Sequence, residues 1–470
     1  MPKTTRWMDG VVSQRPSPGI QDLVGEALRH HQAGRLAEAE RIYRQVLAVD
    51  PGHPDGLHLL GMVACQTGDA DRAAELIRRA IAVKGDAASY HSNLGNVLES
   101  QGNLAEAGAC YQRALLLRPE LAEVHLNLGN IFRAQSEPAT SLACYRRALA
   151  LNPGLAEAAV AESRVLLLQG EFAAGWPGLE RRWQTREFDT PMRAYPQPRW
   201  TGGPLASGRL LIWGEQGIGD EVMFASLIPD VLRTGTRCVL DCDARLKPLF
   251  ARSFPEVDVV AGFDPASHPE LEIAAQMPSG SLPGMFRNSV EAFAGTTSPY
   301  LVADPIARGR LRERYSDGRR LIGLAWHTKN RRTGRSRSIE LTSLAPLFEV
   351  RGIRWVSLQY GDHDSLEEEA AAANVPLLVD REVDQLTDPD GFAAQIAAMD
   401  LAITIDNSTA HLAGALGVPA WVMLPFAPDW RWLLERDDSP WYPAVRLFRQ
   451  TRLGDWGSVI EGVRSALDQT

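Results

Sequence analysis

The sequence predicts an all-α repeat array followed by an α/β region with two halves. Small and aromatic residues recur every 34 positions through the first third of the 470-residue chain. A proline-rich, aperiodic stretch, TPMRAYPQPRWTGGP, then begins at Thr190, and strand-like runs alternate with helical ones beyond it. A fixed period indicates stacked repeats, and strand–helix alternation is typical of βαβ units in parallel sheets.

Four columns of residues define the repeat, each spaced by 34 positions or a multiple of 34. They are a glycine column (Gly34, Gly68, Gly102, Gly170, with Ser136 in the remaining slot), a second glycine column (Gly61, Gly95, Gly129), an alanine column (Ala39, Ala73, Ala107) and a tyrosine column (Tyr43, Tyr111, Tyr145). Small residues let paired helices approach closely, and aromatic residues fill the space between pairs. The pattern resembles the tetratricopeptide repeat, which implies a solenoid whose concave face binds peptide; a spacer or dimerisation arm is the alternative.

The α/β region predicts two series of strands. In the first, RLLIW (209–213) leads through a glycine turn to a helix at 222–232 and to strands at 237–242 and 257–260. The second follows a charged helix at 307–317, with strands at 321–327, 353–359, 375–379, 401–406 and 420–424 and helices at 341–349, 391–399, 409–416 and 456–469. Two Rossmann-like halves predict a substrate cleft between them. The expected parts are a mobile tail (1–18), the repeats (19–187), a linker (188–206) and the two halves (207–306 and 307–470).

The turn WGEQGIGDE (213–221) stands where the first of these strands ends. Its glycines follow G-x-x-G-x-G, whereas dinucleotide-binding turns follow G-x-G-x-x-G. A helix N-terminus attracts anions, and here Asp220 and Glu221 fill that field and repel pyrophosphate. This charge disfavours a dehydrogenase with Asp241 on a ribose. Two interpretations remain, carboxylates that only cap the helix and a general base at the mouth of the cleft.

A second polar turn, IDNSTAH (405–411), ends a strand and begins a helix. Its hydroxyl and backbone N–H groups face the crevice at the carboxyl end of a parallel strand, where anions and ligands bind. Asn407 or Ser408 is either a helix cap or a phosphate-binding group, and both roles can coexist. His411 is either a donor to phosphate or sugar or a core histidine.

Both turns resemble motifs of one enzyme family. GEQGIGDEVMFASLIPDVL resembles the first loop, and DNSTAHLAGALGVPAWVML the donor-binding segment, of the heptosyltransferase-type glycosyltransferases (family nine). The resemblance covers roughly residues 205–470. It implies a GT-B fold, in which two Rossmann-like domains face each other across a cleft, and an inverting, metal-independent glycosyl transfer from a nucleotide sugar. It implies Asp220 as the catalytic base and Asp406, Asn407, Ser408 and His411 as the donor-binding turn, and Arg337 falls near a phosphate-binding position of the family. We also assign Thr409 to the donor site and Gln216, Gly217, Gly219 and Glu221 to an acceptor-side loop.

Further polar residues follow the strands of the second half. HTKNRRTGRSR (327–337) places five basic residues in one loop, and Lys329 with Arg337 suits donor phosphates; a merely solvated loop is the alternative. In LQYGDHD (358–364), we assign Gln359 and Asp362 to the base or ribose of the donor. Asp241-Cys242-Asp243 spells DxD, a metal motif of another transferase class, but it lies in the half opposite the donor motif, so we expect no metal.

Two repeats have nearly the same sequence at equivalent positions, SNLGN (92–96) and LNLGN (126–130). Equivalent positions stack in line along a solenoid, and an asparagine amide both donates and accepts, so it pairs with any peptide backbone. The repeat text resembles the O-GlcNAc transferase family, which implies that Asn93, Asn96, Asn127 and Asn130 bind peptide. The alternative is that these asparagines only tie helix to helix.

Composition excludes several classes of protein. A net charge of −9 argues against a dedicated nucleic-acid binder. No apolar run approaches the roughly 20 residues that span a bilayer, and the start MPKTTRWMDG lacks a signal-peptide core. Five cysteines without CxxC spacing predict reduced thiols. We therefore expect a cytoplasmic protein with no cofactor besides its donor substrate.

The ending LPFAPDWRWLLERDDSPWYP resembles bacterial proteins that join tetratricopeptide repeats to this transferase domain, some implicated in flagellin glycosylation. We therefore expect a protein glycosyltransferase whose repeats recruit a protein acceptor, with flagellin as a candidate, and whose repeats also offer a surface for homo-oligomerisation. One alternative is a transferase for a glycan or lipid-oligosaccharide acceptor. The other is a non-catalytic repeat adaptor with a degenerate transferase domain.

Overall fold

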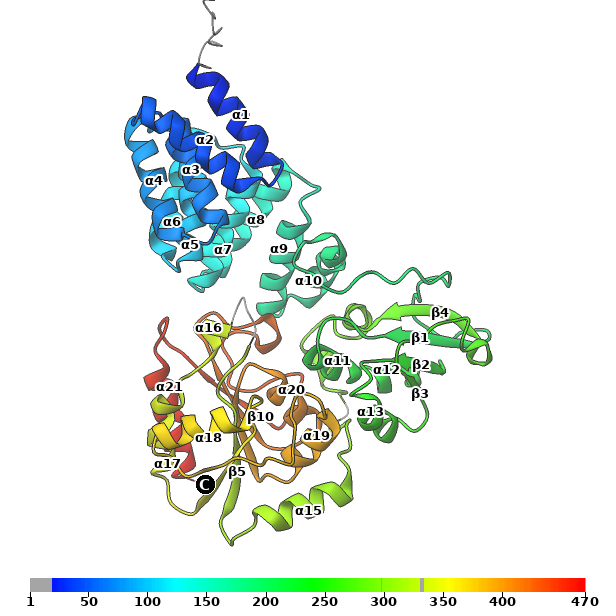
Figure 1. The fold of residues 1–470 in the computed structure, drawn as a ribbon. Helices are drawn as coiled ribbons and strands as arrows, with labels where there is room; N and C mark the ends of the chain where they lie inside the picture. The colour runs from blue at the N-terminus through cyan, green and yellow to red at the C-terminus, as the bar shows by residue number, and fades with distance from the viewer. Residues whose placement is uncertain (1–18, 297, 330–333, 470) are drawn as a thin grey trace, which may run out of the picture. The chain divides into compact units, whose positions relative to one another are not determined.

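The computed structural model describes residues 19–296, 298–329 and 334–469. The segment expected to be a mobile tail, 1–18, lies outside these residues. The chain divides into two compact units, Met1–Ile131 and Phe132–Thr470, each of which is described by itself (Figure 1).

The first unit is all-helical and pairs its helices in the way the 34-residue period predicts. Gly95 packs against Tyr111, because a Cβ atom on Gly95 would lie 2.5 Å from the tyrosine ring. The glycine and tyrosine columns thus form one packing contact between the two helices of a repeat. The helices are α1 (Ile20–Gln32), α2 (Leu36–Val49), α3 (Pro54–Gln66), α4 (Ala70–Val83), α5 (Ala88–Ser100), α6 (Leu104–Leu117) and α7 (Ala122–Ala134), the last of which continues into the second unit.

The second unit begins with the remaining repeat helices. These are α8 (Pro138–Leu151), α9 (Ala156–Leu168) and α10 (Phe172–Leu179), and a short 3-10 helix, η1 (Glu180–Gln184), follows them directly. Phe172 and Trp176 of α10 belong to the same buried core as the strands that come next in the chain. The end of the repeat region is therefore packed into the α/β fold.

The first sheet has four parallel strands in the order β3-β2-β1-β4. They are β1 (Arg209–Trp213), β2 (Cys238–Asp241), β3 (Asp258–Val260) and β4 (Ile273–Pro278), with α11 (Ile218–Ala225), α12 (Ile228–Arg233), α13 (Lys247–Ser253) and α14 (Pro283–Phe286). The single helix expected at 222–232 is wrong: Pro229 has no N–H to bond the carbonyl of Ala225, so α11 ends and α12 begins. The sequence analysis also missed β4, because IAAQMP has few residues of high β-propensity.

The second sheet has six parallel strands in the order β10-β9-β8-β5-β6-β7. They are β5 (Arg320–Leu324), β6 (Ile353–Ser357), β7 (Leu377–Leu378), β8 (Leu401–Ile405), β9 (Ala420–Leu424) and β10 (Val445–Arg449). The helices are α15 (Pro305–Tyr315), α16 (Gly334–Arg337), α17 (Ala345–Phe348), α18 (His363–Ala372), α19 (Pro389–Ala397), α20 (Ser408–Ala415) and α21 (Trp456–Leu467). The edge strand β10 was not predicted. Its alternation of buried Val445 and Leu447 with exposed Arg446 is the signal that could have revealed it.

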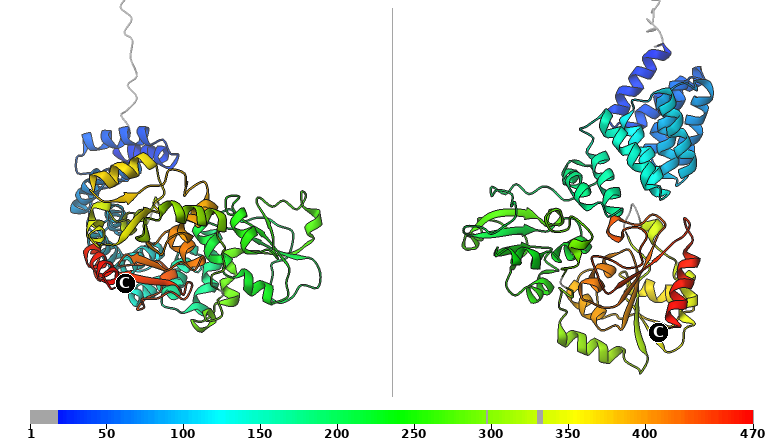
Figure 2. Two further views of the ribbon diagram at one scale, coloured as in Figure 1. Left: turned by 90° about the horizontal axis from the view of Figure 1, so that it is seen from below. Right: turned by 180° about the vertical axis from the view of Figure 1, so that it is seen from behind.

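Helices cover both faces of the second sheet, as the two views in Figure 2 show. One face packs with α17, α18 and α21, and the other with α19 and α20, in two separate hydrophobic clusters. Every residue of β8 and β9 is buried, as expected for central strands of a parallel sheet. The strand order reverses between β1 and β4 in the first sheet and between β5 and β8 in the second. Ligands of open α/β sheets bind beyond the carboxyl ends of strands at such points.

Candidate functional site

The structure brings together the two turns that the sequence analysis singled out. The helix α11 begins beyond the end of β1, α20 begins beyond the end of β8, and the two helices contact each other. A Cβ atom on Gly219 would lie 3.2 Å from Cδ2 of His411 and 3.6 Å from Cα of Ser408. A larger residue at position 219 would therefore require the His411 side chain to shift slightly.

Asp220 links the turn of β1 to the second half of the unit. One carboxylate oxygen is ion-paired with Arg431 of the 3-10 helix η6 (Trp430–Trp432), and the other lies 3.5 Å from the backbone nitrogen of Gly217. The side chain is 21% exposed, so solvent reaches it. Asp220 thus caps α11 and also faces the second sheet, which leaves both interpretations of this carboxylate open.

Glu221, the next residue, is enclosed by the first half alone. Its carboxylate accepts a hydrogen bond of 3.0 Å from the backbone of Asp243, and it lines a small cavity with Gly214 and Ser279. Burial raises the pKa of Glu221 to about 7, and the neighbouring carboxylates of Asp243 and Asp241 act in the same direction. The two adjacent acidic residues of the turn therefore differ in environment.

Asp220 is one end of a chain of alternating charges, which we call the charged cluster. Arg431 also contacts Asp429 at 2.6 Å, and Arg337 contacts Asp406 at 3.0 Å and Asp429 at 3.5 Å. The sequence analysis assigned Asp220, Asp406 and Arg337 to a site but missed Arg431 and Asp429. Both lie in DWRW, a stretch that was noted only for its resemblance to other proteins.

The carboxylates of the charged cluster differ in their protonation. Burial opposes ionisation of Asp429, but the guanidinium groups of Arg431 and Arg337 outweigh it and hold the pKa of Asp429 well below its usual range. Burial raises the pKa of Asp406, and the attraction of Arg337 only partly offsets this effect. The pKa values of the two buried aspartates are thus shifted in opposite directions, although both aspartates contact Arg337.

The turn of β8 contains polar groups that have no partner in the described residues. The Asn407 side-chain oxygen accepts from the backbone of Thr409 at 3.0 Å and of Ala410 at 3.4 Å, so Asn407 is the N-cap of α20. The side-chain nitrogen of Asn407 and the hydroxyl of Thr409 are buried without a hydrogen-bond partner there. Unsatisfied buried donors are costly, and beside a helix N-terminus they suit an anionic ligand.

His411 lies one turn into α20 and is buried. Its Nδ1 is 2.8 Å from the hydroxyl of Tyr442, and its ring stacks on Trp432 with a centroid distance of 5.5 Å. Burial, with further repulsion from Arg431, lowers the pKa of His411 to about 3. The imidazole is therefore neutral near pH 7 and bonds to a neutral phenol.

The other residues that we assigned to donor binding form hydrogen bonds within the protein. The side chain of Gln359 bonds to backbone groups of Trp326, His327 and Tyr360, so it shapes the loop after β5. Asp362 caps α18 through the backbone of Ser365 at 3.0 Å. The backbone of Lys329 donates to the Tyr360 hydroxyl at 2.7 Å, while Arg331 and Arg332 of the same loop lie outside the described residues.

Arginines engage both carboxylates of the DxD sequence. Asp241 is ion-paired with Arg193 and its side chain is 1% exposed, and Asp243 contacts Arg245 at 2.8 Å. Within the described ranges, no group of three or more histidine, cysteine, aspartate or glutamate side chains is placed to hold a metal ion.

The asparagines of the first unit bond to neighbouring helices. The side-chain nitrogen of Asn93 lies 2.8 Å from Nε2 of His58, and the oxygen of Asn96 accepts from Asn127 at 2.9 Å and from the hydroxyl of Tyr111 at 2.7 Å. These contacts are those of the helix-to-helix alternative. Peptide binding by Asn93, Asn96, Asn127 and Asn130 stays a prediction.

Comparisons with known proteins identify the repeats. Residues 30–96, 86–154 and 126–189 each match a model described as tetratricopeptide repeat. Protein FlbA of Caulobacter vibrioides is 34% identical over 329 residues, which are 65% of this chain, and the match spans about half, 54%, of that relative.

Solved structures resemble about a third of the chain. A crystal structure of MamA is 20% identical, with a TM-score of 0.31, and covers 33% of this chain and 91% of its own. The PilF structure from Pseudomonas aeruginosa is 24% identical, with a TM-score of 0.33, and covers 34% and 74% respectively. Across the part of the chain that the structure describes, no helix combines the length and the apolar character needed to cross a membrane. The chain thus carries tetratricopeptide repeats, which support a role in binding protein partners, ahead of an α/β region with two parallel sheets.

Proposed function

We propose that this protein is an inverting, metal-independent GT-B glycosyltransferase that moves a sugar from a nucleotide donor to a hydroxyl group of a protein. The observation that carries the proposal is the contact between α11 and α20. The two turns that separately resemble an acceptor loop and a donor-binding segment lie against each other, at the carboxyl ends of two parallel sheets.

The donor would bind at the start of α20. The helix N-terminus attracts phosphate, and the unpartnered donors of Asn407 and Thr409 are buried at that end. Arg337 and Arg431 add two guanidinium groups within the charged cluster. Guanidinium groups form strong paired hydrogen bonds with phosphate oxygens. Phosphate oxygens would take over part of the contacts that carboxylates make here.

The acceptor would meet Asp220. Its carboxylate takes the proton of the acceptor hydroxyl as that oxygen attacks the anomeric carbon. The bond from the anomeric carbon to the phosphate oxygen breaks, and the nucleotide leaves with the negative charge, which the arginines stabilise. A positioned base contributes roughly 10²–10⁴ in rate, and charge stabilisation adds a comparable factor.

The repeats would supply the protein acceptor. Tetratricopeptide repeats support protein binding, and flagellin is the first acceptor to test because of the bacterial repeat transferases that the C-terminal sequence resembles.

A non-catalytic adaptor is the second candidate. It is favoured by the ion pairs of the charged cluster, because Asp220 is bound to Arg431 and Arg337 is bound to two carboxylates. In that case the cluster holds the two halves together and the repeats alone carry the function.

A nucleotide screen separates the two candidates. UDP, CMP, GDP and ADP are added to the purified full-length protein, and thermal unfolding is followed, since a ligand that binds the native state raises the melting temperature. We expect one nucleotide to raise it in a saturable way, with the matching nucleoside inactive, and the matching nucleotide sugar to be hydrolysed slowly. If none of the four shifts the transition and no nucleotide sugar is consumed, the adaptor is the better description.

A further inference from the structure

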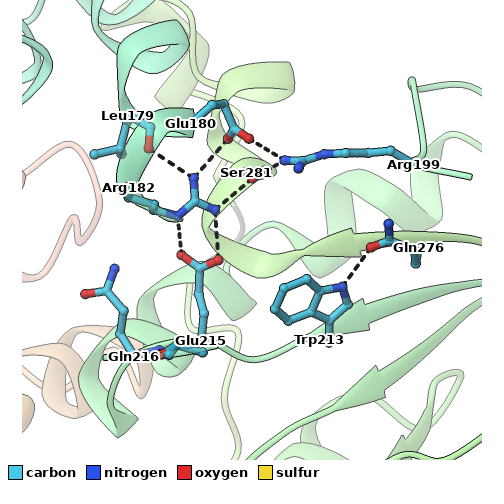
Figure 3. A network of polar contacts seen from close by, with 10 residues as sticks. Leu179, Glu180, Arg182, Arg199, Trp213, Glu215, Gln216, Gln276 and Ser281 are labelled. Carbon is cyan, nitrogen blue, oxygen red and sulfur yellow. Dashed lines mark hydrogen bonds and ion pairs between the residues drawn. The ribbon is translucent and has the colours of Figure 1, made fainter. Parts of the chain in front are cut away.

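A buried ion pair joins the end of the repeat region to the turn that carries Asp220 (Figure 3). Arg182 of η1 contacts Glu215 through two parallel bonds, Nε to Oε1 at 2.9 Å and Nη2 to Oε2 at 2.8 Å. The side chains of Arg182 and Glu215 are 3% and 1% exposed. Glu215 lies five positions before Asp220 in the same turn.

The remaining bonds of Arg182 go to its own segment and to the segment after β4. Its guanidinium donates to the carbonyl of Leu179 at 3.3 Å, to Glu180 at 3.1 Å and to the hydroxyl of Ser281 at 2.9 Å. Arg199 closes the outside of this network by bonding to Glu180 and Ser281, as Figure 3 shows. One guanidinium group thus connects the end of the repeat region, the turn that carries Asp220 and the segment after β4.

The backbone of the turn depends on such support. Gln216 has φ of 64°, a left-handed conformation that a residue with a side chain rarely adopts. Its N–H donates to the hydroxyl of Thr190 at 2.7 Å. Strained backbone persists where surrounding contacts determine it, and here Glu215 and Thr190 fix the turn from both sides.

The same repeat end also supports the partner of Asp220. Trp176 of α10 packs edge-on against Trp430, with ring centroids 5.5 Å apart, and its indole nitrogen donates to the carbonyl of Arg287 at 2.6 Å. Trp430 directly precedes Arg431, whose guanidinium lies 4.5 Å from the centre of the Trp430 ring. Residues 172–184 therefore contact both segments that form the Asp220–Arg431 pair.

We propose that residues 172–184 act as a clasp that sets the geometry of the Asp220–Arg431 pair, with Arg182 as the positioning residue of the turn. A desolvated ion pair is a poor source of stability but defines one arrangement of its partners. In this arrangement the end of the repeat region positions residues of the proposed transferase site. The catalytic meaning of the proposal rests on the proposed function, whereas its structural claim does not.

Hydrogen–deuterium exchange of the full-length protein tests the structural claim. Arg182→Lys keeps the charge but loses the two-point contact with Glu215, because lysine presents a single ammonium group. We expect amide exchange across residues 214–221 to rise about tenfold or more, as expected for a segment that opens locally, while segments that Arg182 does not contact keep their rates. The control is Arg314→Lys in α15, because Arg314 pairs with the buried carboxylate of Asp380 at 2.6 Å in the second half and not with residues 172–184.

Enzyme kinetics tests the catalytic claim with the same variants. If a nucleotide sugar is found to be a donor, Arg182→Lys should lower kcat about tenfold or more and leave the KM of the donor within about twofold, because Asp220 is displaced and α20 is not. Failure to find any donor refutes the proposed function and leaves the exchange result standing.

Unchanged exchange at 214–221 in a folded Arg182→Lys protein overturns the clasp, as does an equal increase in Arg314→Lys. Should Arg182→Lys not fold, the double variant Arg182→Met/Glu215→Leu carries the test. It removes both charges, and apolar replacement of a buried pair is often tolerated. Protected amides at 214–221 in this double variant would equally refute the proposal.

Discussion

Asp220 and Arg431 are 211 residues apart in the sequence and form an ion pair at the meeting point of α11 and η6. Arg431 also forms an ion pair with Asp429, and Arg337 forms ion pairs with both Asp429 and Asp406. A carboxylate of the first half and the strand-end aspartate of the second thus belong to one charged cluster.

Asp220→Asn should keep the nucleotide-induced shift in melting temperature and lower glycosyl transfer by about two orders of magnitude or more, because the amide cannot take a proton. Transfer and thermal shift are measured on one preparation. Asp258→Asn is the control, since Asp258 is 50% exposed on the edge strand β3 and its change should leave transfer within about threefold. Near-normal turnover of Asp220→Asn would show that this residue is only a helix cap and an ion-pair partner.

Arg337→Ala should raise the Kd of the nucleotide about tenfold, because charge-assisted bonds to phosphate are strong. Arg335→Ala is the matched control: Arg335 lies in the same short helix but is exposed. Calorimetry should give an unchanged Kd for Arg335→Ala. His411→Ala should also weaken nucleotide binding, and unchanged affinity in both Arg337→Ala and His411→Ala would move the donor site elsewhere.

The raised pKa of Glu221 predicts that the stability of the protein depends on pH. Its folded pKa of about 7 lies above its unfolded value, so the folded state holds the proton more tightly. Stability from this residue is fully present below about pH 4.5 and is lost as the pH rises to about 7, by at most about 3 kcal/mol. Glu221→Gln should therefore gain melting temperature relative to the parent between pH 5 and pH 8. A difference that does not change with pH would contradict the raised pKa.

Asn93→Ala/Asn127→Ala should weaken binding of the acceptor protein by about tenfold and leave spontaneous donor hydrolysis unchanged. The structure adds a control, since Asn93 bonds to His58. His58→Ala removes that contact and keeps both asparagines, so a loss of acceptor affinity in this variant too would trace the effect to the helix packing. Equal acceptor affinity in the double variant and the parent would show that these asparagines do not bind the acceptor protein.

Treatment with EDTA should leave glycosyl transfer intact. The aspartates of the DxD sequence are bound by Arg193 and Arg245, and the proposed chemistry uses arginines and N–H groups at the leaving phosphate. Activity that disappears with EDTA and returns with manganese would assign Asp241 and Asp243 to a metal after all.

The sequence by itself determined the features that local rules govern. The 34-residue columns exposed the repeats, because each position in the repeat meets the same neighbours, as Gly95 meets Tyr111. Largely apolar runs identified the central strands β8 and β9, which are buried on both faces. The polar turns after β1 and β8 could be found because strand ends and helix starts leave a signature within about ten residues. Where the local pattern was weak, as in β4 and the edge strand β10, the prediction failed.

Tertiary structure alone decided which of those residues meet. Nothing in the sequence near Asp220 indicates Arg431, because an ion pair over 211 residues depends on how two sheets pack and leaves no period or motif. The same holds for Arg182 and Glu215, whose charges become significant only once both are buried and face each other. Local propensity and periodicity are properties of short segments, whereas the electrostatics of a site depend on distance and burial, which only the folded chain defines.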